Sequence, residues 1–418
     1  MKKKIAIISW PDASINGAGM VANDIFHLIN SSSHGFEAHF WRGASKRHSQ
    51  DAYVFDLYGG AISKFGYKVA RYLSRKAGLA DFIPVDLPMH LLRKPCDYDL
   101  YHFHALSSGF SPVSLLWIAR RKPSVWTFHD CAPFTGGCVY PSVSDCDAFT
   151  RRCGNCPQLH EWPFFSKLDF TGFMQDYKKK IGKEENLRAI VPSRWMAGEV
   201  MKSGMLSSEP IIIPNCVDLT RFRPLDKAMA RQKLGLPHDS FIVITGAASL
   251  RNKRKGFKYA IDALLSLPKK PYVLALGRDP GGIFDSSLSI KFTGYIHDKW
   301  EMALYYSSAD IFLFPTLADN LPLVAIETMA CGTPVVGFRT GGLPEIVDHD
   351  LNGWLVTPKD VQGLAEGIRI AMSDFARLRS WADHGLRKVG DCYNPDLFLE
   401  RHLEVYDALL KRCKKEHE

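Results

Sequence analysis

Short runs of apolar, mostly β-branched residues alternate along the chain with stretches in which apolar residues recur at helical spacing. Several runs are continuously apolar, as is typical of strands buried on both faces of a parallel sheet. Between them, Val21, Ile25, Leu28 and Ile29 follow the spacing i, i+4, i+7 and i+8, and Val361–Met372 has similar spacing. This alternation predicts an α/β protein with doubly wound parallel sheets. We expect strands at Lys4–Trp10, Asp99–Phe103, Ser124–Phe128, Arg188–Val191, Phe241–Thr245, Tyr272–Ala275, Ile290–Thr293, Asp310–Phe314, Thr333–Gly337 and Trp354–Val356.

The length of 418 residues accommodates two such sheets. We place the first domain at residues 1–212 and the second at residues 213–394, because the stretch Pro210–Leu236 holds several prolines and little periodicity. A final helix, Pro395–Arg412, carries apolar residues on one face and is expected to pack back on the first domain.

Composition and charge narrow the class of protein. Hydrophobic residues make up 46% of the chain and charged residues 23%, which is ordinary for a globular protein and argues against collagen, coiled coil and wholesale disorder. The net charge of +9 does not by itself indicate nucleic-acid binding, but it suits anionic small molecules or an anionic membrane surface. No apolar run reaches the length of about 18 residues that a spanning helix needs, and the apolar start is too short for a signal peptide. We therefore expect a soluble, cytoplasmic protein.

Two loops that follow predicted strands have the chemistry of anion sites. Asn16–Gly19 opens a helix directly after the first strand, where glycine lets backbone N–H groups approach an anion. It lacks a third glycine, so a tight strand–helix turn is an equal explanation. Ser249–Phe257 is rich in arginine and lysine at the carboxyl end of a strand, where open α/β sheets bind ligands such as phosphates. Its alternative is a solvated run of charges.

The segment Phe314–Val336 is the most specific. It holds two acidic residues, Asp319 and Glu327, with seven residues between them, followed by Ala330–Val336, which reads A-C-G-T-P-V-V. This arrangement resembles the donor-binding signature of the retaining glycosyltransferases of family 4, which have the GT-B fold: two acidic residues at this spacing, then A-x-G-x-P-V-V. The family usually has glutamate at the position of Asp319.

The resemblance extends over nearly the whole chain. His129–Cys138 and Cys153–Leu159 resemble a bacterial subgroup of the family that builds exopolysaccharide, colanic-acid-type and O-antigen chains. The segments that match the family elsewhere are Gly17–Gly19, Thr127–Asp130, Val191–Ser193, Ile213–Asp218, Gly342–Val347 and Asn352–Val356.

The resemblance implies two Rossmann-like domains that face a cleft, and transfer of a sugar from a UDP- or GDP-type nucleotide sugar with retention and without a catalytic metal. The acceptor is expected to be a growing, lipid-linked bacterial surface polysaccharide or oligosaccharide. Ser249 stands where the family has a phosphate-binding arginine, so either Arg251 or Arg254 supplies the second cation. The implied catalytic residues are His129, Lys255 and Asp319, and the implied donor-binding residues are Gly17, Gly19, Arg251, Arg254, Lys255, Gly294, Tyr295, Asn320, Leu321 and Glu327.

These roles follow from the charge that accumulates on the diphosphate leaving group in the transition state. By resemblance, Lys255, an adjacent arginine and the glycine loop hold that charge. Glu327, expected at the start of a short helix, accepts hydrogen bonds from the ribose hydroxyls. Backbone groups of Asn320–Pro322 orient the sugar, and those near Gly294–Ile296 read the base. His129 lies on the acceptor side, although a packed, hydrogen-bonded histidine is the alternative.

Four of the ten cysteines, Cys138, Cys146, Cys153 and Cys156, lie close together and include one C-x-x-C pair. Four thiolates can close a tetrahedral zinc site, which here would pin a long loop rather than take part in the reaction. The other pair is too loosely spaced for a standard zinc ribbon, so free thiols or two local disulfides are alternatives. A cytoplasmic setting disfavours disulfides. No cofactor is expected to be required for catalysis.

A lipid-linked acceptor would bring the protein to the inner face of the cytoplasmic membrane. The stretch Lys64–Lys76 alternates basic and apolar residues, as an amphipathic helix with a basic face does, and Lys2–Lys4 and Lys411–Lys415 add further cations. The alternative is a helix whose apolar face packs into the first domain.

Two other functions compete with sugar transfer. One is another nucleotide-sugar enzyme on the same fold, such as a 2-epimerase, and the other is a non-catalytic module that binds polysaccharide or nucleic acid. For the transferase, no nucleic-acid partner is expected. Slow hydrolysis of the donor, formation of a sugar isomer, or no reaction would separate the three.

Overall fold

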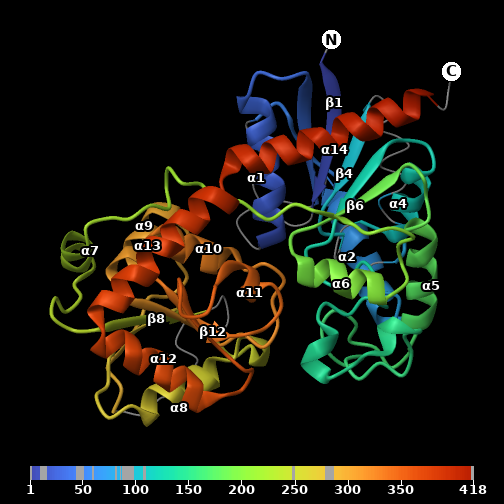
Figure 1. The fold of residues 1–418 in the computed structure, drawn as a ribbon. Helices are drawn as coiled ribbons and strands as arrows, with labels where there is room; N and C mark the ends of the chain where they lie inside the picture. Colours follow the sequence, from blue (N-terminus) through green and yellow to red (C-terminus); the bar gives the residue numbers. More distant parts are fainter. Residues whose placement is uncertain are drawn as a thin grey trace. The chain divides into compact units, whose positions relative to one another are not determined.

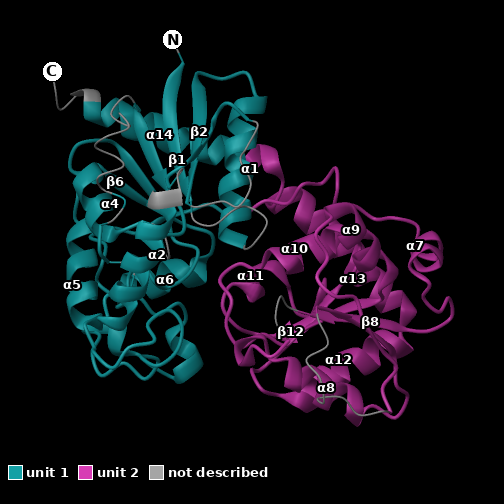
Figure 2. Ribbon diagram, turned by 180° about the vertical axis from the view of Figure 1, so that it is seen from behind, with its two compact units in different colours: residues 1–213, 398–418 teal, residues 214–397 magenta. Residues whose placement is uncertain are grey.

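The structure is a computed structural model that describes residues 2–9, 17–43, 51–58, 61–80, 82–84, 86, 98–106, 110–246, 250–277 and 287–415. The chain forms two compact units (Figures 1 and 2). Unit 1 comprises Met1–Ile213 and Phe398–Glu418, and unit 2 comprises Pro214–Leu397. Each unit contains one parallel sheet with helices around it, which confirms the predicted fold class.

Unit 1 is built on a seven-stranded sheet in the order β3-β2-β1-β4-β5-β6-β7, with every neighbouring pair parallel. Its central strand β1 buries Ile5–Ile8 completely, as a strand covered on both faces should. The strands are β1 (Lys3–Ser9), β2 (Phe36–Arg42), β3 (Val54–Asp56), β4 (Leu100–Phe103), β5 (Ser124–Thr127), β6 (Leu187–Val191) and β7 (Ile211–Ile212), and the helices are α1 (Gly17–Ser31), α2 (Ala61–Lys76), α4 (Pro112–Ala119), α5 (Thr171–Ile181), α6 (Arg194–Lys202) and α14 (Pro395–Lys415).

Three strands of this sheet, β2, β3 and β7, are not predicted by the hydrophobic pattern. β2 mixes apolar with polar residues and is only half buried at several positions. β3 and β7 have three and two residues and lie at the two edges of the sheet. Edge strands do not need the continuous apolar run by which a central parallel strand is recognised.

Unit 2 has a six-stranded parallel sheet in the order β10-β9-β8-β11-β12-β13. Ile242 and Ile244 of β8 belong to one apolar core, whereas Val243 belongs to the core on the other face. The strands are β8 (Ile242–Gly246), β9 (Tyr272–Leu276), β10 (Ile290–Phe292), β11 (Ile311–Phe314), β12 (Val335–Phe338) and β13 (Gly353–Val356), and the helices are α7 (Lys227–Leu234), α8 (Phe257–Ser266), α9 (Lys299–Ser308), α10 (Leu323–Ala330), α11 (Leu343–Ile346), α12 (Val361–Ser373) and α13 (Phe375–Cys392).

Each sheet has one point at which the strand order reverses. In unit 1 the chain runs from β1 outward to β3 and returns to β4, on the other side of β1. In unit 2 it runs from β8 outward to β10 and returns to β11, on the other side of β8. Open α/β sheets bind their ligands at the carboxyl ends of the strands that flank such a point. The loops after β8 and β11, and after β1 and β4, are therefore where function is to be sought.

The last helix, α14, lies mostly in unit 1 (Figure 2). Tyr406 is fully buried, and its hydroxyl lies 2.7 Å from Nδ1 of His102 in β4. Nearby at the surface, Lys3 donates to the carboxylate of Asp407 at 2.9 Å. One internal polar contact and one surface ion pair thus join this helix to strands far away in the sequence.

We expect Tyr406→Phe to lower the free energy of unfolding by about 1–3 kcal/mol, because it leaves a buried nitrogen of His102 without its partner. Asp407→Asn, which removes only the exposed ion pair, should cost less than about 1 kcal/mol. Urea unfolding of the three proteins measures both values. Equal stabilities of the Tyr406 and Asp407 variants would show that the buried contact does not anchor the helix.

Candidate functional site

The cationic loop of unit 2 leaves the carboxyl end of β8 and touches the end of β11. Lys253–Lys255 form a single 3₁₀ turn, capped by the side chain of Asn252, which accepts a backbone N–H of the turn at 3.1 Å. Gly256 follows with φ of +67°, and a Cβ atom there would lie 1.8 Å from the carbonyl oxygen of Pro315. Only glycine fits this close approach, which sets Lys255 beside the loop that follows β11.

Asp319, in that second loop, holds two cations. Its Oδ2 accepts from Lys255 Nζ at 2.5 Å and lies 3.5 Å from Nη1 of Arg254. The same arginine nitrogen donates to the carbonyl of Ala318 at 2.5 Å, and Lys255 Nζ lies 5.7 Å from the centre of the Phe314 ring. The three charged side chains are largely buried and together carry one net positive charge.

The two candidates for the second cation differ in position. Arg254 shares Asp319 with Lys255, whereas Arg251 is exposed in the turn that precedes them. Ser249 lies outside the described residues. The structure therefore brings Arg254, Lys255 and Asp319 together at the point where the strand order reverses.

The loop between β11 and α10 is fixed through its backbone. The carbonyl of Asn320 accepts from the N–H of Gly342 at 2.7 Å, and that of Leu321 accepts from the amide of Asn215 at 3.2 Å. Gly341 has φ of +55°, and a Cβ atom there would lie 1.7 Å from the carbonyl oxygen of Asp319. The loops after β11 and β12 are thus locked together, and α10 begins directly beyond them. The first N–H groups of a helix have no partner within it and attract an anion.

Glu327 lies in the second turn of α10, not at the start of the helix as expected. The reason is that the helix begins immediately after Pro322, four residues earlier. The side chain is buried, with 7% of the residue exposed, and its Oε2 accepts from the hydroxyl of Tyr306 at 3.4 Å. Burial and the nearby carboxylate raise the pKa of Tyr306 well above its usual range, so its hydroxyl remains a donor. Tyr306 is a residue of this site that the sequence analysis misses.

Gly294 and Tyr295 follow β10 in the chain. The N–H and the carbonyl of Gly294 pair with those of Gly277 at 3.1 and 3.0 Å. The backbone N–H and carbonyl of Gly294 are therefore engaged with Gly277, within the segment Gly294–Ile296 that is expected to read the base. Tyr295 is exposed, and its ring centre lies 4.6 Å from that of His297.

In unit 1, His129 belongs to a group of four histidines. Nδ1 of His104, just after β4, lies 2.9 Å from Nε2 of His129, just after β5, and the two rings stack. His102 contacts the hydroxyl of Thr127 at 2.8 Å, and His402 of α14 lies across from His102. His129 is half buried, so it is both hydrogen-bonded and accessible. The sequence signal for its neighbours is a His-x-His pair at the end of a predicted strand.

Burial keeps these histidines neutral. It lowers the pKa of His129 to about 3, with a smaller contribution from the charge of His402, and it lowers the pKa of His402 to about 4. Burial likewise holds the pKa values of His102 and His104 well below the usual range. At neutral pH the group therefore offers hydrogen-bond donors and acceptors rather than charge.

A small cavity of about 50 Å³ lies against this group and is lined by His104, Trp126, His129 and Lys178. Nε2 of His104 and Nε1 of Trp126 are buried and have no hydrogen-bond partner among the described residues. Buried polar atoms nearly always have a hydrogen-bond partner in native proteins. We therefore expect a bound molecule to supply a partner for these two nitrogens. A hydroxyl, which both donates and accepts, fits that requirement.

The glycine-containing loop appears in the structure only in part. Gly17 is the first residue of α1, and Gly19 is buried within the first turn, so both lie in the helix rather than in the loop before it. Residues 10–16, which include Asn16, lie outside the described residues.

The four cysteines predicted as metal ligands line one small cavity of about 20 Å³, as free thiols. The N–H of Gly136 donates to the sulfur of Cys153 at 3.3 Å, and Asp169 accepts from the N–H of Cys156 at 2.8 Å. Burial raises the pKa values of Cys138 and Cys153. In the part of the chain that the structure describes, no three cysteine, histidine or carboxylate side chains are close enough to hold a metal ion.

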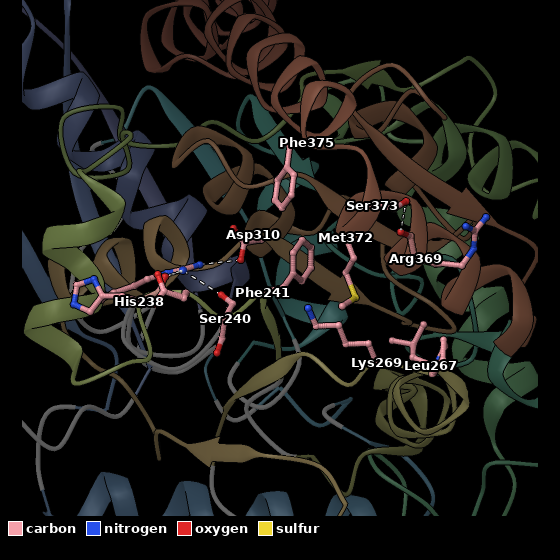
Figure 3. Close-up of a pocket in the computed structure, with 13 residues that line it drawn as sticks. His238, Ser240, Phe241, Leu267, Lys269, Asp310, Arg369, Met372, Ser373 and Phe375 are labelled. Atoms are coloured by element: carbon pink, nitrogen blue, oxygen red, sulfur yellow. Dashed lines mark hydrogen bonds and ion pairs between the residues drawn. The ribbon is translucent and has the colours of Figure 1, made fainter.

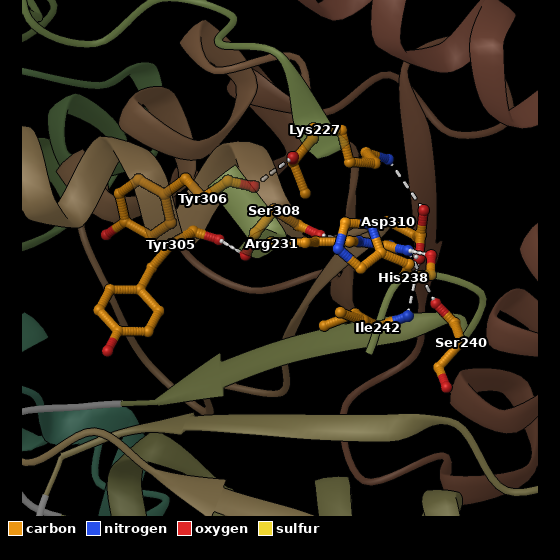
Figure 4. A network of polar contacts seen from close by, with 10 residues as sticks. Lys227, Arg231, His238, Ser240, Ile242, Tyr305, Tyr306, Ser308 and Asp310 are labelled. Carbon is orange, nitrogen blue, oxygen red and sulfur yellow. Dashed lines mark hydrogen bonds and ion pairs between the residues drawn. The ribbon is translucent and has the colours of Figure 1, made fainter. Parts of the chain in front are cut away.

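A roomier cavity of about 460 Å³ lies at the amino ends of the strands in unit 2 (Figure 3). Its buried ion pair is held within the protein. Arg231 donates to the carboxylate of Asp310 at 2.8 Å and to the carbonyl of Ser308 at 3.0 Å, and Asp310 also accepts from the N–H of Ile242 at 2.7 Å (Figure 4). This network fastens the amino end of β8 to that of β11, and we read it as structural.

Two family models match the chain. One, described as Glycosyltransferase Family 4, matches residues 32–221, and the other, Glycosyl transferases group 1, matches residues 241–374. D-inositol 3-phosphate glycosyltransferase of Saccharomonospora viridis is 30% identical over 75% of this chain and 71% of that protein. D-inositol 3-phosphate glycosyltransferase 1 of Catenulispora acidiphila is 32% identical over 47% of this chain, which spans half of that protein.

Solved structures of similar fold cover almost all of the chain. Sucrose-phosphate synthase from Thermosynechococcus elongatus gives a TM-score of 0.72 at 21% identity, over 98% of this chain and 100% of the other. Anabaena HepE in complex with UDP and glucose gives 0.67 at 17%, over 97% and 100%. WaaG, a glycosyltransferase involved in lipopolysaccharide biosynthesis, gives 0.61 at 14%, over 94% and 97%. In the described part of this chain, no helix is both long and apolar enough to cross a membrane.

The neutral histidines predict a loss of stability in acid. Because folding lowers their pKa values, the unfolded chain binds more protons below about pH 6.5, and each such histidine should cost about 1.4 kcal/mol per pH unit down to its folded pKa. For His402 this window runs from 6.5 down to about 4. His402→Gln should show a shallower fall in unfolding free energy between pH 6.5 and 4 than the wild type, measured by urea unfolding.

The exposed His160 serves as the control, because His160→Gln should keep the wild-type slope. If His402→Gln lost stability with falling pH as steeply as the wild type, the histidine would not be held neutral by burial.

Proposed function

This chain belongs to the family 4 and group 1 glycosyltransferases of the GT-B fold, and we propose that it transfers a sugar from a UDP- or GDP-sugar to a lipid-linked bacterial surface oligosaccharide or polysaccharide. Transfer proceeds with retention and without a catalytic metal. The observation that carries the proposal is that the carboxylate of Asp319 forms ion pairs with both Lys255 and Arg254, just before the start of α10.

The diphosphate of the donor fits this arrangement for electrostatic reasons. Two cations with one carboxylate leave a net positive charge, and the first N–H groups of α10 add a partial positive charge. The loops that hold these groups are fixed by Gly256 and Gly341, so the charges need little rearrangement when the leaving group develops its own. Proteins of similar fold have been solved in complex with UDP and with UDP-glucose, which supports a donor of this class.

Glu327 is suited to the ribose of the donor. Its buried carboxylate has two oxygens, and a pair of adjacent hydroxyls can donate to both. Tyr306 steadies the carboxylate from inside the protein. We assign the sugar itself to the backbone of Asn320 and Leu321, whose carbonyls are tied back by Gly342 and Asn215.

In the proposed reaction the bond between the anomeric carbon and the diphosphate breaks while the acceptor hydroxyl attacks from the same face. The acceptor proton passes to the departing diphosphate, so no enzymic nucleophile is required. Lys255 and Arg254 stabilise the charge on that leaving group. His129, neutral at working pH, holds a hydroxyl of substrate by hydrogen bonding in unit 1, and His104 fixes its ring.

The acceptor class is inferred from sequence motifs and from polar atoms of unit 1. The names of the relatives point to inositol phosphate, and that of WaaG points to lipopolysaccharide. We favour a surface saccharide because His129–Cys138 and Cys153–Leu159 resemble the bacterial subgroup that builds such chains. The unsatisfied atoms of His104 and Trp126 are suited to a saccharide hydroxyl.

We expect Lys255→Ala and Glu327→Ala each to lower kcat/KM for donor hydrolysis by about 100-fold or more, about 2.7 kcal/mol of transition-state stabilisation. Lys255→Arg should restore only part of the activity, since its geometry differs. Asp319→Ala removes the holder of the cations rather than a cation and should lose less. The measurement is release of the nucleoside diphosphate from a panel of UDP- and GDP-sugars.

Lys253→Ala is the matched control, because Lys253 is an exposed cation of the same turn. Its activity should stay within about threefold of the wild type. Near wild-type activity in Lys255→Ala would refute the assignment of this loop, and a second sugar isomer as product would make the protein an epimerase.

We also propose a structural zinc ion held by Cys138, Cys146, Cys153 and Cys156. Their shared cavity and the backbone N–H that donates to the sulfur of Cys153 suit thiolate ligands, and a bound zinc ion would draw the deprotonated sulfurs together. Zinc would cross-link the loop between β5 and α5, and it has no part in the reaction.

Elemental analysis should find about one zinc per chain in purified protein. Cys153→Ser with Cys156→Ser should remove the metal and lower the melting temperature, whereas Cys392→Ser, at an exposed position, should do neither. Metal-free protein with four thiols that titrate in the folded state would rule the zinc site out.

A further inference from the structure

Helix α2 turns an apolar face to solvent. Phe65, Val69, Tyr72 and Leu73 recur at i, i+4, i+7 and i+8 and are all exposed, Phe65 by 70% and Tyr72 by 62%. The buried face carries Tyr67, whose ring stacks on another tyrosine of unit 1. The alternative expectation, that the apolar face of this helix packs into the first domain, is therefore wrong for these four residues.

The loop segment 162–173 packs at the carboxyl end of α2 and carries further exposed apolar residues. Ser166 donates to the carbonyl of Lys76, the last residue of α2, at 3.1 Å. Gly78 packs directly against the backbone of Leu168, since a Cβ atom on it would lie 2.1 Å from that carbonyl oxygen. The exposed apolar residues of α2, of the following segment and of the loop form what we call the apolar surface: Phe65, Val69, Tyr72, Leu73, Ile83, Trp162, Phe165, Leu168, Phe170 and Phe173.

Apolar exposure is concentrated there. Within the described ranges of the chain, ten of the nineteen large apolar side chains that are exposed belong to the apolar surface. Scattered exposed apolar residues are normal, but a gathering of this size marks an interaction site. The aromatic rings also favour a membrane interface, because aromatic residues are enriched where one side of a residue meets lipid and the other meets water.

The charges beside the apolar surface are all of one sign along α2. The helix contains five basic residues and no acidic one. Lys68 and Lys76 are exposed, and Nζ of Lys76 lies 5.8 Å from the centre of the Tyr72 ring. In the loop, Lys167 is exposed, while Asp169 turns its oxygens toward the backbone N–H groups of Cys156 and Thr171.

We propose that the apolar surface docks unit 1 on an anionic lipid bilayer. An amphipathic helix with apolar and aromatic residues on one face and lysine beside them is the arrangement that lies in the headgroup region, with its apolar side chains inserted and its cations on the lipid phosphates. A protein partner of matching chemistry would have to be both apolar and acidic, whereas an anionic bilayer supplies both properties by itself. The proposal rests on the proposed function, for which it names the place where a lipid-linked acceptor is met.

Vesicle flotation tests the proposal on the whole protein. Wild-type protein should float with vesicles of phosphatidylcholine and phosphatidylglycerol at low salt, and should float much less with phosphatidylcholine alone. Its flotation should fall as salt is raised toward the physiological range, because the electrostatic part of the attraction is screened. Absence of flotation with the anionic vesicles at low salt, or equal flotation with both kinds of vesicle, would overturn the proposal.

Variants separate the apolar from the electrostatic contribution. Phe65→Ser with Tyr72→Ser, and Lys68→Glu with Lys76→Glu, should each lower the bound fraction at least severalfold. The matched controls lie in unit 2: Phe375→Ser removes an equally exposed ring, and Lys233→Glu with Lys269→Glu makes the same change of charge. Both controls should float like the wild type, and equal losses in variants and controls would contradict a specific surface.

Two further measurements, sedimentation and donor hydrolysis, separate membrane docking from the alternatives. Sedimentation in solution would detect a second copy: if the wild type is a dimer and Phe65→Ser with Tyr72→Ser is a monomer, the surface is a protein interface and the proposal is wrong. Hydrolysis of a soluble donor should be unchanged in all four sets of variants. A wild type that floats but does not hydrolyse any donor would leave the docking surface standing and refute the proposed function instead.

Discussion

The contact between Lys255 and Asp319 is the interaction on which the candidate site depends. It joins the loop after β8 to the loop after β11, two strands that lie side by side only because the strand order reverses between them. Gly256 and Gly341 make the contact possible, since any side chain there would push the loops apart. The same carboxylate also holds Arg254, so a single acidic residue sets the position of two cations before any anion arrives. The network of Arg231 and Asp310 performs the corresponding fastening at the amino ends of the same strands.

The two units offer different chemistry to substrates. Unit 2 presents charge, in the form of cations, a helix start and a buried carboxylate, which is what a nucleoside diphosphate and its ribose require. Unit 1 presents imidazoles that burial keeps in the neutral form. It also presents buried nitrogens of His104 and Trp126 that have no hydrogen-bond partner among the described residues. A saccharide hydroxyl, which both donates and accepts hydrogen bonds, can use such partners. This division is consistent with a donor in one unit and an acceptor hydroxyl at the other.

Much of this could be predicted from the sequence, and the failures have physical causes. All ten predicted strands lie in the two sheets, because parallel strands buried on both faces require continuous apolar runs, whereas the edge strands β3 and β7, with three and two residues, are too short to be recognised in this way. Asp319, Glu327 and Lys255 could be singled out as candidates because the motif spacing fixes their positions. Their mutual contacts could not, since the role of Asp319 as holder of Lys255 depends on which strands are neighbours. Tyr306 and His104 act through contacts made across the fold, and the outward apolar face of α2 has the same periodicity as a buried one.

The central claim is that Lys255, positioned by Asp319, binds the terminal phosphate of the donor diphosphate. The most direct test compares the affinities of UDP and UMP, or of GDP and GMP if the base is guanine, in the wild type and in Lys255→Ala by calorimetric titration. The account predicts that the wild type prefers the diphosphate by at least about tenfold, equivalent to about 1.4 kcal/mol, and that this preference nearly vanishes in the variant. If Lys255→Ala retained the full preference for the diphosphate, the claim would be contradicted.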